Sequence, residues 1–337
     1  MMLPQIKFFV DRIDPRYVFT LVDIGAMGGV PQKWNLLRPG MKVIAFEPDR
    51  REFAKLQNSS NITYYNCALY KQSKDLKYYV TRGHGKSSFY PPDERIVSQF
   101  EDQQRFAIVK EEVLPCEQVK SLDCVLEENS IADMDFIKLD TQGSELPILE
   151  GGQKKVIPNI FGINVEIEFI QIYKDQPLFR DVDQFMDQNG FQLMDLRRAY
   201  WKRKDYYDYI GKGQLVFGDA LYFKKIDTLI QELSKSDNHA YAVAKIYKSI
   251  LICFIYRLFD YAVAVARASR ELNLLSASDY QEALTTIKIY SKKNVLAHFP
   301  GKPWLYKITH RLSQILKPPS YLGWADGDHT IGNIKDT

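Results

Sequence analysis

The first part of the chain, residues 17–225, alternates between short apolar runs and longer stretches with apolar residues at helical spacing. This alternation is typical of a parallel sheet whose strands are joined by crossover helices. We therefore predict an α/β domain over residues 1–225. The predicted strands are 19–24, 42–46, 62–67, 135–139, 163–169, 191–196 and 214–223.

The pattern changes after Phe223. Helix formers become frequent and glycines rare, which predicts a C-terminal helical appendage over 226–317. Its helical stretches are 226–233, 240–270 and 278–290. Residues 318–337 begin with two prolines and contain further glycines, so we predict an irregular tail there.

A long segment, 70–128, separates the third and fourth predicted strands. Within it, the runs 76–80 and 87–90 flank an Arg-Gly-His-Gly sequence, as in a hairpin. We expect this insertion to lie over the carboxyl ends of the strands, where open sheets bind ligands. His84 would then reach the pocket as a base. The more common situation for such a histidine is simple solvation.

Composition narrows the classes of function. The chain is 45% hydrophobic and 26% charged, as in ordinary globular proteins, and its net charge of +3 is too small to indicate a nucleic-acid partner. The four cysteines form no Cys-x-x-Cys pair, so we expect no metal site and no disulfide framework. The N-terminus has no signal-peptide pattern, and we expect a cytoplasmic protein.

The most membrane-like stretch is 250–256, which is bounded by charged residues. It is far shorter than the roughly 18 apolar residues that a membrane span needs, so we predict a buried helix. The stretch 308–317 alternates apolar and basic residues at helical spacing. Membrane contact through the helical C-terminus is therefore a less favoured but open interpretation.

A glycine cluster follows the first predicted strand, in the run from Asp23 through Gly25 and Ala26 to Gly29. Glycines at a strand end allow a tight turn and close approach of the backbone to a ligand. Glu47 ends the next strand some 20 residues further on, where doubly wound folds place an acid that binds ribose hydroxyls. Together these residues favour a nucleoside site over a plain strand-to-helix turn.

A third contact is expected after the third strand, in the run 66–69. Small residues there, Ala68 among them, would leave a slot for a flat base. Ordinary packing of small residues explains this run equally well.

The fourth and fifth predicted strands carry polar residues on one face, which is unusual for strands covered by helices. We expect Lys138 to pair with Glu166 inside the sheet. Asp140 and Glu168 lie nearer the carboxyl ends and are expected to reach the pocket. Glu145 follows at the start of a helix, where a carboxylate also serves as a cap.

At these residues the chain resembles the FkbM-type methyltransferases. The segments that carry the resemblance are 22–26, 45–48, 87–88, 121–123, 136–145, 149–152, 165–169 and 188–191. They span roughly Phe19 to Phe223, and the run from Asp140 to Glu145 is the specific part, since many methyltransferases share an Asp-x-Gly turn.

The resemblance implies a class I methyltransferase fold, which is Rossmann-like. With the strands predicted above, we expect a seven-stranded sheet whose last strand, 214–223, is antiparallel. The resemblance also implies S-adenosylmethionine as the methyl donor and O-methylation of a hydroxyl on a small-molecule or glycan acceptor, such as a sugar, polysaccharide or polyketide. The family commonly has asparagine where Met27 stands here, so the methionine end of the donor is expected to be bound differently.

Under this interpretation the site residues take distinct roles. The residues expected to bind the donor are Asp23, Gly25, Ala26, Gly29, Glu47 and Ala68. Asp140 is expected to bind the donor's ammonium group or to receive the acceptor's proton. Glu168 and His84 are expected on the acceptor side, where a base removes the hydroxyl proton.

Two other interpretations fit parts of the sequence. An NAD-dependent sugar-modifying enzyme of doubly wound fold would also use a glycine turn and an acid, but the run Gly25-Ala-Met-Gly28 lacks the full dinucleotide fingerprint. An inactive methyltransferase-fold scaffold would bind a partner or a membrane through its helical C-terminus and would bind no donor.

Overall fold

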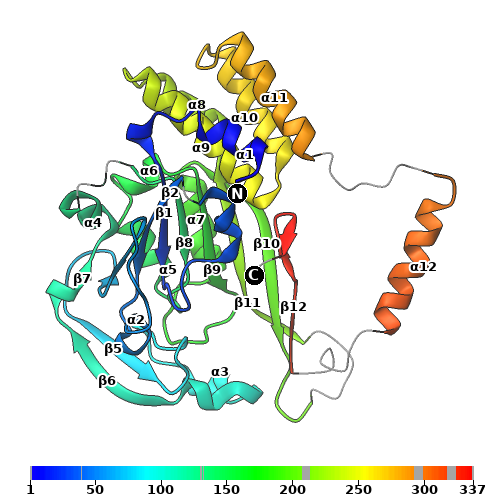
Figure 1. The fold of residues 1–337 in the computed structure, drawn as a ribbon. Helices are drawn as coiled ribbons and strands as arrows, with labels where there is room; N and C mark the ends of the chain where they lie inside the picture. The colour runs from blue at the N-terminus through cyan, green and yellow to red at the C-terminus, as the bar shows by residue number, and fades with distance from the viewer. Residues whose placement is uncertain are drawn as a thin grey trace.

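The computed structural model describes residues 2–38, 40–129, 131, 133–206, 213–291, 299–316 and 324–335. Its centre is a mixed sheet of eight strands in the order β12-β10-β11-β9-β8-β1-β2-β3 (Figure 1). The strands are β1 (Phe19–Ile24), β2 (Met41–Phe46), β3 (Ile62–Tyr65), β8 (Phe136–Leu139), β9 (Gly162–Glu168), β10 (Phe191–Trp201), β11 (Gln214–Lys224) and β12 (Ala325–Gly327).

The strand order reverses at β1. The strands β3, β2, β1, β8 and β9 run parallel, while β11 is antiparallel to both β9 and β10. The chain first proceeds from β1 to β2 and β3 on one side, and later places β8 on the other side of β1. Ligands of open sheets bind at the carboxyl ends of strands next to such a reversal. A ligand site is therefore expected at the carboxyl ends of β1, β2 and β8.

The predicted strand count was wrong by one. All seven predicted strands are present in the sheet and β11 is antiparallel as expected, but the tail adds β12 antiparallel to β10. The Lys202 amide donates to the Trp324 carbonyl at 2.7 Å, and Arg198 forms an ion pair with Asp328 at 2.8 Å. These contacts hold a strand where the sequence predicted irregular structure.

The helices are α1 (Pro4–Val10), α2 (Arg50–Phe53), α3 (Glu94–Val97), α4 (Leu122–Glu128), α5 (Glu145–Glu150), α6 (Val156–Asn159), α7 (Phe179–Gln188), α8 (Ile226–Ser234), α9 (His239–Tyr256), α10 (Phe259–Glu271), α11 (Ala277–Ser291) and α12 (Lys302–Ile315). Short strands outside the main sheet are β4 (Ala68–Leu69), β5 (Leu76–Thr81), β6 (Ile108–Leu114), β7 (Val119–Lys120), β13 (Thr330–Ile331) and β14 (Ile334–Lys335). A 3-10 helix, η2 (Gln32–Leu37), follows the turn after β1.

Each face of the sheet packs on a different set of helices. Val22 and Ile24 of β1 and Ile137 of β8 lie in a core with α4, α5, α6 and α7, which come between strands in the sequence. Successive residues of a strand point to opposite faces, so Leu21 and Phe136 lie in a second core. That second core contains α1, η2 and helices α8 to α11.

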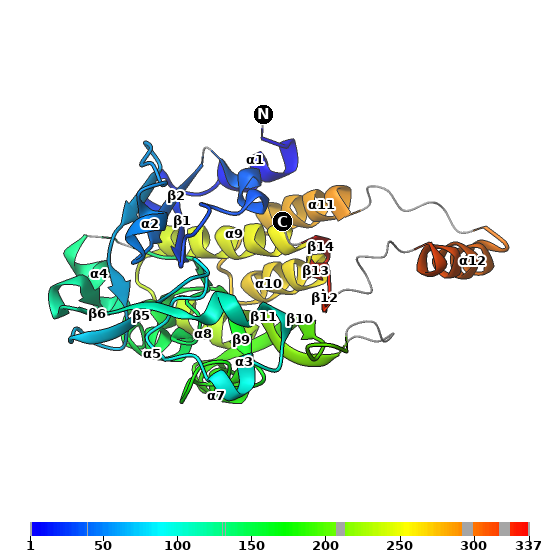
Figure 2. The same cartoon turned by 90° about the horizontal axis from the view of Figure 1, so that it is seen from below.

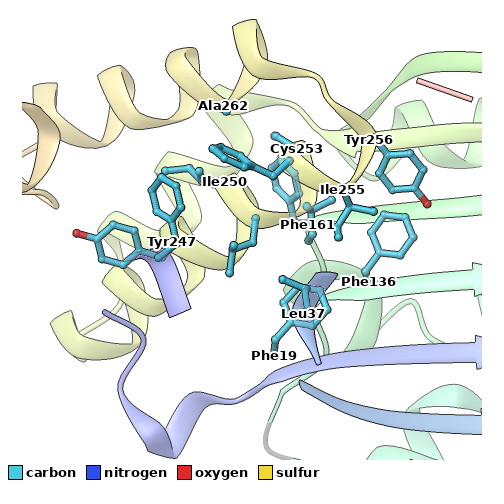
Figure 3. Close-up of a cluster of buried hydrophobic side chains, with 14 of the residues drawn as sticks. Phe19, Leu37, Phe136, Phe161, Tyr247, Ile250, Cys253, Ile255, Tyr256 and Ala262 are labelled. Carbon is cyan, nitrogen blue, oxygen red and sulfur yellow. The ribbon is translucent and has the colours of Figure 1, made fainter. Parts of the chain in front are cut away.

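The C-terminal helix α9 lies against this second face of the sheet. Figure 3 shows Phe136 of the sheet beside Tyr256 of α9, with ring centroids 5.5 Å apart. The prediction of a buried helix at 250–256 is confirmed, because every residue of that stretch is buried within α9. The helical region expected as an appendage therefore shares a core with the sheet.

Two buried lysines of α9 reinforce this packing. The Lys245 Nζ lies 2.5 Å from Asp133 and 2.9 Å from Asp135, and the Lys248 Nζ lies 3.0 Å from each of the same two acids. Asp133 and Asp135 immediately precede β8. The four charges thus join α9 to the amino end of a central strand.

The insertion folds over the carboxyl edge of the sheet, as expected, but with a different pairing. The strand β5 pairs with β6, while Ser88 meets Tyr79 at an isolated bridge with hydrogen bonds of 2.8 and 3.2 Å. The hairpin predicted between 76–80 and 87–90 is therefore reduced to this single antiparallel bridge, and β6 is the main partner of β5.

Helix α12 differs from the others in its position. Both views show it apart from the rest of the protein (Figures 1 and 2). Within the described ranges, each helix is too short or too polar to cross a bilayer.

Candidate active site

A left-handed turn after β1 forms one wall of the candidate site. Gly25 has a φ of +77°, and a Cβ built there would lie 1.7 Å from the carbonyl oxygen of Asp140. Glycine alone avoids both the strain and the clash. The amides of Gly25 and Ala26 donate to the Phe46 carbonyl at 3.0 and 3.1 Å, which ties the turn to the end of β2.

This turn borders a cavity of about 260 Å³ at the carboxyl ends of β1, β2 and β8. The predicted site residues that line it are Gly25, Glu47, Ala68, His84 and Asp140. The predicted site residues outside its lining are Asp23, Ala26, Gly29 and Glu168. Met27, at the position where the resembling family has asparagine, also lines the cavity.

Glu47 presents a buried carboxylate at the end of β2. Its side chain is 5% exposed, and its Oε1 accepts a 2.9 Å hydrogen bond from the Asp49 amide. Burial raises the pKa of Glu47 to about 7. A carboxylate has more acceptor positions than this one amide uses, so Glu47 retains capacity for ligand hydroxyls.

The run after β3 forms an apolar slot beside Glu47. Cys67, Ala68 and Leu69 line the cavity together with Tyr78 and Phe89 of the insertion. Ala68 is buried and contributes only a methyl group. The position expected for a flat ring is therefore lined by small and aromatic side chains.

Lys138 pairs with Asp23, and the predicted pair with Glu166 was wrong. The Lys138 Nζ lies 3.4 Å from Asp23 and 3.8 Å from Asp140, and donates to the Gly25 carbonyl at 2.8 Å. Strand register explains the difference, because Lys138 lies opposite Asp23 on β1 and opposite Asn164 on β9. Asp23 is fully buried beneath the glycine turn and holds Lys138 in place.

His84 contacts an acid that the sequence did not mark. Its Nδ1 makes a short contact with Glu52 Oε1, and both residues line the cavity. Glu52 is 8% exposed. Hydrogen bonds from the Lys55 ammonium and, to a smaller extent, from His84 lower the pKa of its carboxyl group. A carboxylate at Nδ1 fixes the ring orientation and leaves Nε2 to face another group. No sequence pattern linked Glu52 with His84.

Gln142 connects the insertion to the end of β8. Its backbone has a φ of +59°, which is unusual for a residue with a side chain. Its Nε2 donates to Glu166 at 2.5 Å, and its Oε1 accepts from Lys86 and from the Tyr173 hydroxyl at 3.1 and 3.0 Å. The Ser88 hydroxyl donates to the backbone carbonyl of Gln142 at 2.6 Å. Gln142 lies in the run from Asp140 to Glu145, the specific part of the family resemblance. That run was the sequence signal that could have identified Gln142 as a site residue.

The remaining acids of the edge are also buried: Glu166 lines the cavity, while Glu145 and Glu168 lie outside its lining. Glu145 accepts from the amides of Thr141 and Gly143 at 2.8 and 2.9 Å, so it organises the loop that follows β8. Burial raises its pKa to about 7. Burial also raises the pKa of Glu166 and Glu168 well above the ordinary value, and neighbouring acids add to both shifts.

The strand order defines the class of protein. A parallel sheet that reverses at β1, with β11 inserted antiparallel between β9 and β10, is the arrangement of class I methyltransferases. The family model described as Methyltransferase FkbM domain matches residues 23–193, just over half of the chain. The chain belongs to the FkbM methyltransferase family.

Similar solved structures were also found, at low similarity. A precorrin-6y C5,15-methyltransferase from Geobacter metallireducens is 10% identical over 65% of this chain and 87% of that chain, with a TM-score of 0.32. An rRNA methylase from Streptococcus thermophilus is 11% identical over 65% and 93%, with a TM-score of 0.27. The N-terminal domain of EvdMO1, in the presence of SAH and D-fucose, is 9% identical over 66% and 81%, with a TM-score of 0.28.

The search of curated proteins found no match.

Proposed function

We propose that the protein transfers a methyl group from S-adenosylmethionine to a hydroxyl of a small-molecule or glycan acceptor. The observation that carries the proposal is the Glu47 carboxylate, buried in the cavity beside the Gly25 turn. An acid at this position of a reversing sheet is suited to bind both hydroxyls of a ribose. The sulfonium of the donor supplies the reactive methyl group.

The residues around Glu47 fit the other parts of such a donor. The slot at Ala68, with Tyr78 and Phe89, suits a flat base. Asp140 lines the cavity on the opposite side of the glycine turn, beside Lys138, and its carboxylate suits the donor's ammonium group. Along one edge of the sheet, the cavity thus offers first an apolar slot, then a carboxylate for the ribose hydroxyls and then a carboxylate for the ammonium group.

His84 is proposed as the base that takes the acceptor's proton. When Nδ1 donates to Glu52, the lone pair of Nε2 is free to accept the proton of a hydroxyl group. Glu52 acts as a positioning residue, because it holds the ring. The insertion that carries His84 also covers the strand ends, which helps to exclude water during the transfer.

The donor site is tested by calorimetric titration with S-adenosylhomocysteine. We expect Glu47→Ala to weaken binding by about tenfold to a hundredfold, since hydrogen bonds to a charged group contribute about 1.5–3 kcal/mol. The matched control is Glu94→Ala, an exposed acid on α3 outside the cavity. Equal affinity in wild type and Glu47→Ala would remove the ribose role. Tighter binding of NAD than of S-adenosylhomocysteine would favour the NAD-dependent alternative.

The role of His84 is tested separately by labelled-methyl transfer to cell extracts. We expect His84→Gln to lower kcat by about 10² to 10⁴ while leaving the affinity for S-adenosylhomocysteine unchanged. Glu52→Gln should lower kcat less than His84→Gln does, because the ring keeps its base but loses the carboxylate that orients it. An unchanged kcat in His84→Gln would exclude it as the base.

A further inference from the structure

Helix α12 has one continuous apolar face. At 100° per residue, its large apolar side chains fall within about a third of the helix circumference. They are Trp304, Leu305, Ile308, Leu312, Ile315 and Leu316. Lys307 and Arg311 flank this arc on the Trp304 side, and Thr309 and Ser313 flank it on the Leu316 side. A continuous apolar face on a helix is normally buried against another surface.

Nothing in the described protein covers this face. Trp304 is 69% exposed, Ile315 is 71% exposed and Leu316 is 77% exposed. Figures 1 and 2 both show α12 away from the sheet and from the other helices. The exposed apolar face of α12 is therefore available to a partner outside the folded body.

The charges of α12 specify the chemistry of that partner. Residues 302–316 contain Lys302, Lys307 and Arg311 and no acidic residue. The full chain has 45 basic and 42 acidic residues, so these three bases equal its entire basic excess. Elsewhere in the chain the two signs nearly balance. A uniformly basic helix is complementary to a negatively charged surface.

The length and the aromatic residues further favour a lipid surface. A helix of 14 residues is about 21 Å long, too short to cross the hydrocarbon core. Trp304 is exposed at one border of the apolar face, and such side chains prefer the boundary between headgroups and acyl chains. Amphipathic helices with these properties lie in the plane of the interface.

We propose that α12 binds the surface of membranes that contain anionic lipids. Its apolar face enters the boundary between headgroups and acyl chains, while Lys307 and Arg311 contact the negative headgroups. This inference is independent of the methyl-transfer proposal, because no residue of α12 lines the cavity.

Co-sedimentation of the full chain with vesicles tests the proposal. We expect binding to vesicles of phosphatidylcholine with phosphatidylserine, weakened by added salt, and little binding to phosphatidylcholine alone. The double variant Lys307→Glu and Arg311→Glu should bind at least about thirtyfold more weakly, since each base near the surface contributes about one factor of five. Leu312→Ser with Ile315→Ser should also lose binding.

A matched control changes charge elsewhere on the surface. Lys235→Glu with Arg267→Glu reverses two exposed bases on the C-cap of α8 and on α10, and should leave vesicle binding unchanged. All variants should keep the wild-type melting temperature, because α12 is exposed. Trp304→Phe should abolish most of the blue shift in tryptophan fluorescence upon vesicle addition, while sedimentation persists.

Three outcomes would overturn the proposal. The first is absence of binding to anionic vesicles, and the second is equal binding by wild type and the Lys307→Glu, Arg311→Glu variant. The third is self-association of the chain that Ile315→Ser dissolves, without vesicle binding, which would make this face a contact between copies.

Discussion

Buried acids have different partners at the two edges of the central sheet. At the amino edge, Asp133 and Asp135 each contact two lysines of α9, and charges of both signs are equal in number. The positive charges of Lys245 and Lys248 lower the pKa of Asp135 against the effect of its complete burial. Asp135 also accepts a hydrogen bond from the Thr20 amide at 2.8 Å.

At the carboxyl edge, buried acids outnumber nearby bases. Burial raises the pKa of four glutamates there, and within the described parts of the chain none of the four forms an ion pair. They are Glu47, Glu145, Glu166 and Glu168. Glu47, Glu145 and Glu166 accept hydrogen bonds from loop amides, from the Thr141 hydroxyl and from the Gln142 side chain.

The presence or absence of a cation partner distinguishes buried acids that stabilise the fold from buried acids that lower its stability when they ionise. A buried carboxylate without a cation destabilises the folded protein when it ionises. Such an arrangement persists where function needs the group. Measurements of stability should therefore distinguish the two edges.

The largest effect is expected at the amino edge. Asp135→Asn leaves two buried lysines with one acid, and breaking a buried ion pair costs about 3–5 kcal/mol. We expect the free energy of unfolding to fall by that amount at pH 7, measured by urea denaturation and circular dichroism.

The matched control for this change is Asp11→Asn. Asp11 pairs with Lys7 on the surface of α1, and exposed pairs contribute at most about 1 kcal/mol. Similar losses for Asp135→Asn and Asp11→Asn would show that the buried cluster does not hold α9 to the sheet.

A smaller change in stability is expected at the carboxyl edge, where it comes from the ionisation of buried acids that have no cation partner. Glu47 and Glu145 have folded-state pKa values of about 7, above their ordinary value of 4.5. The folded protein then binds more protons than the unfolded chain between these values, so its stability falls as pH rises through 7. We expect a loss of about 1 kcal/mol for each group between pH 6 and pH 8 in donor-free protein.

The same urea denaturation series, repeated at several pH values, measures this loss. Constant stability across that window, or stability that rises with pH, would contradict the raised pKa values.

The sequence predicted the sheet well because its parallel strands are short runs rich in apolar residues, separated by stretches of helical pattern. The run 19–24 and the run 163–169 coincide closely with β1 and β9. It missed β12, because Ala325–Gly327 has no apolar alternation and its position depends on pairing with β10. Pairing partners depend on register, which explains why Lys138 was assigned to Glu166 when Asp23 lies opposite it.

The site was predicted in outline. Gly25, Glu47 and Asp140 follow their strands directly, so topology alone brings them to one cavity. Glu168 ends β9 but lies outside that cavity's lining, which Glu166 of the same strand reaches. Glu52 reaches His84 from 32 residues away, a contact that only the folded insertion creates.

The smallest effect tests Glu47 alone. Glu47→Gln cannot ionise, so its stability should fall by about 1 kcal/mol less between pH 6 and pH 8 than that of wild type. The same substitution should weaken binding of S-adenosylhomocysteine, because an amide offers fewer acceptor positions to the ribose hydroxyls. Glu145→Gln serves as the comparison, since Glu145 lies outside the cavity and accepts from loop amides. A variant Glu47→Gln that retains the full pH slope would place the titrating group elsewhere. One that loses the slope but keeps donor affinity would make Glu47 a structural acid, and the contrast between the two edges would lose its functional meaning.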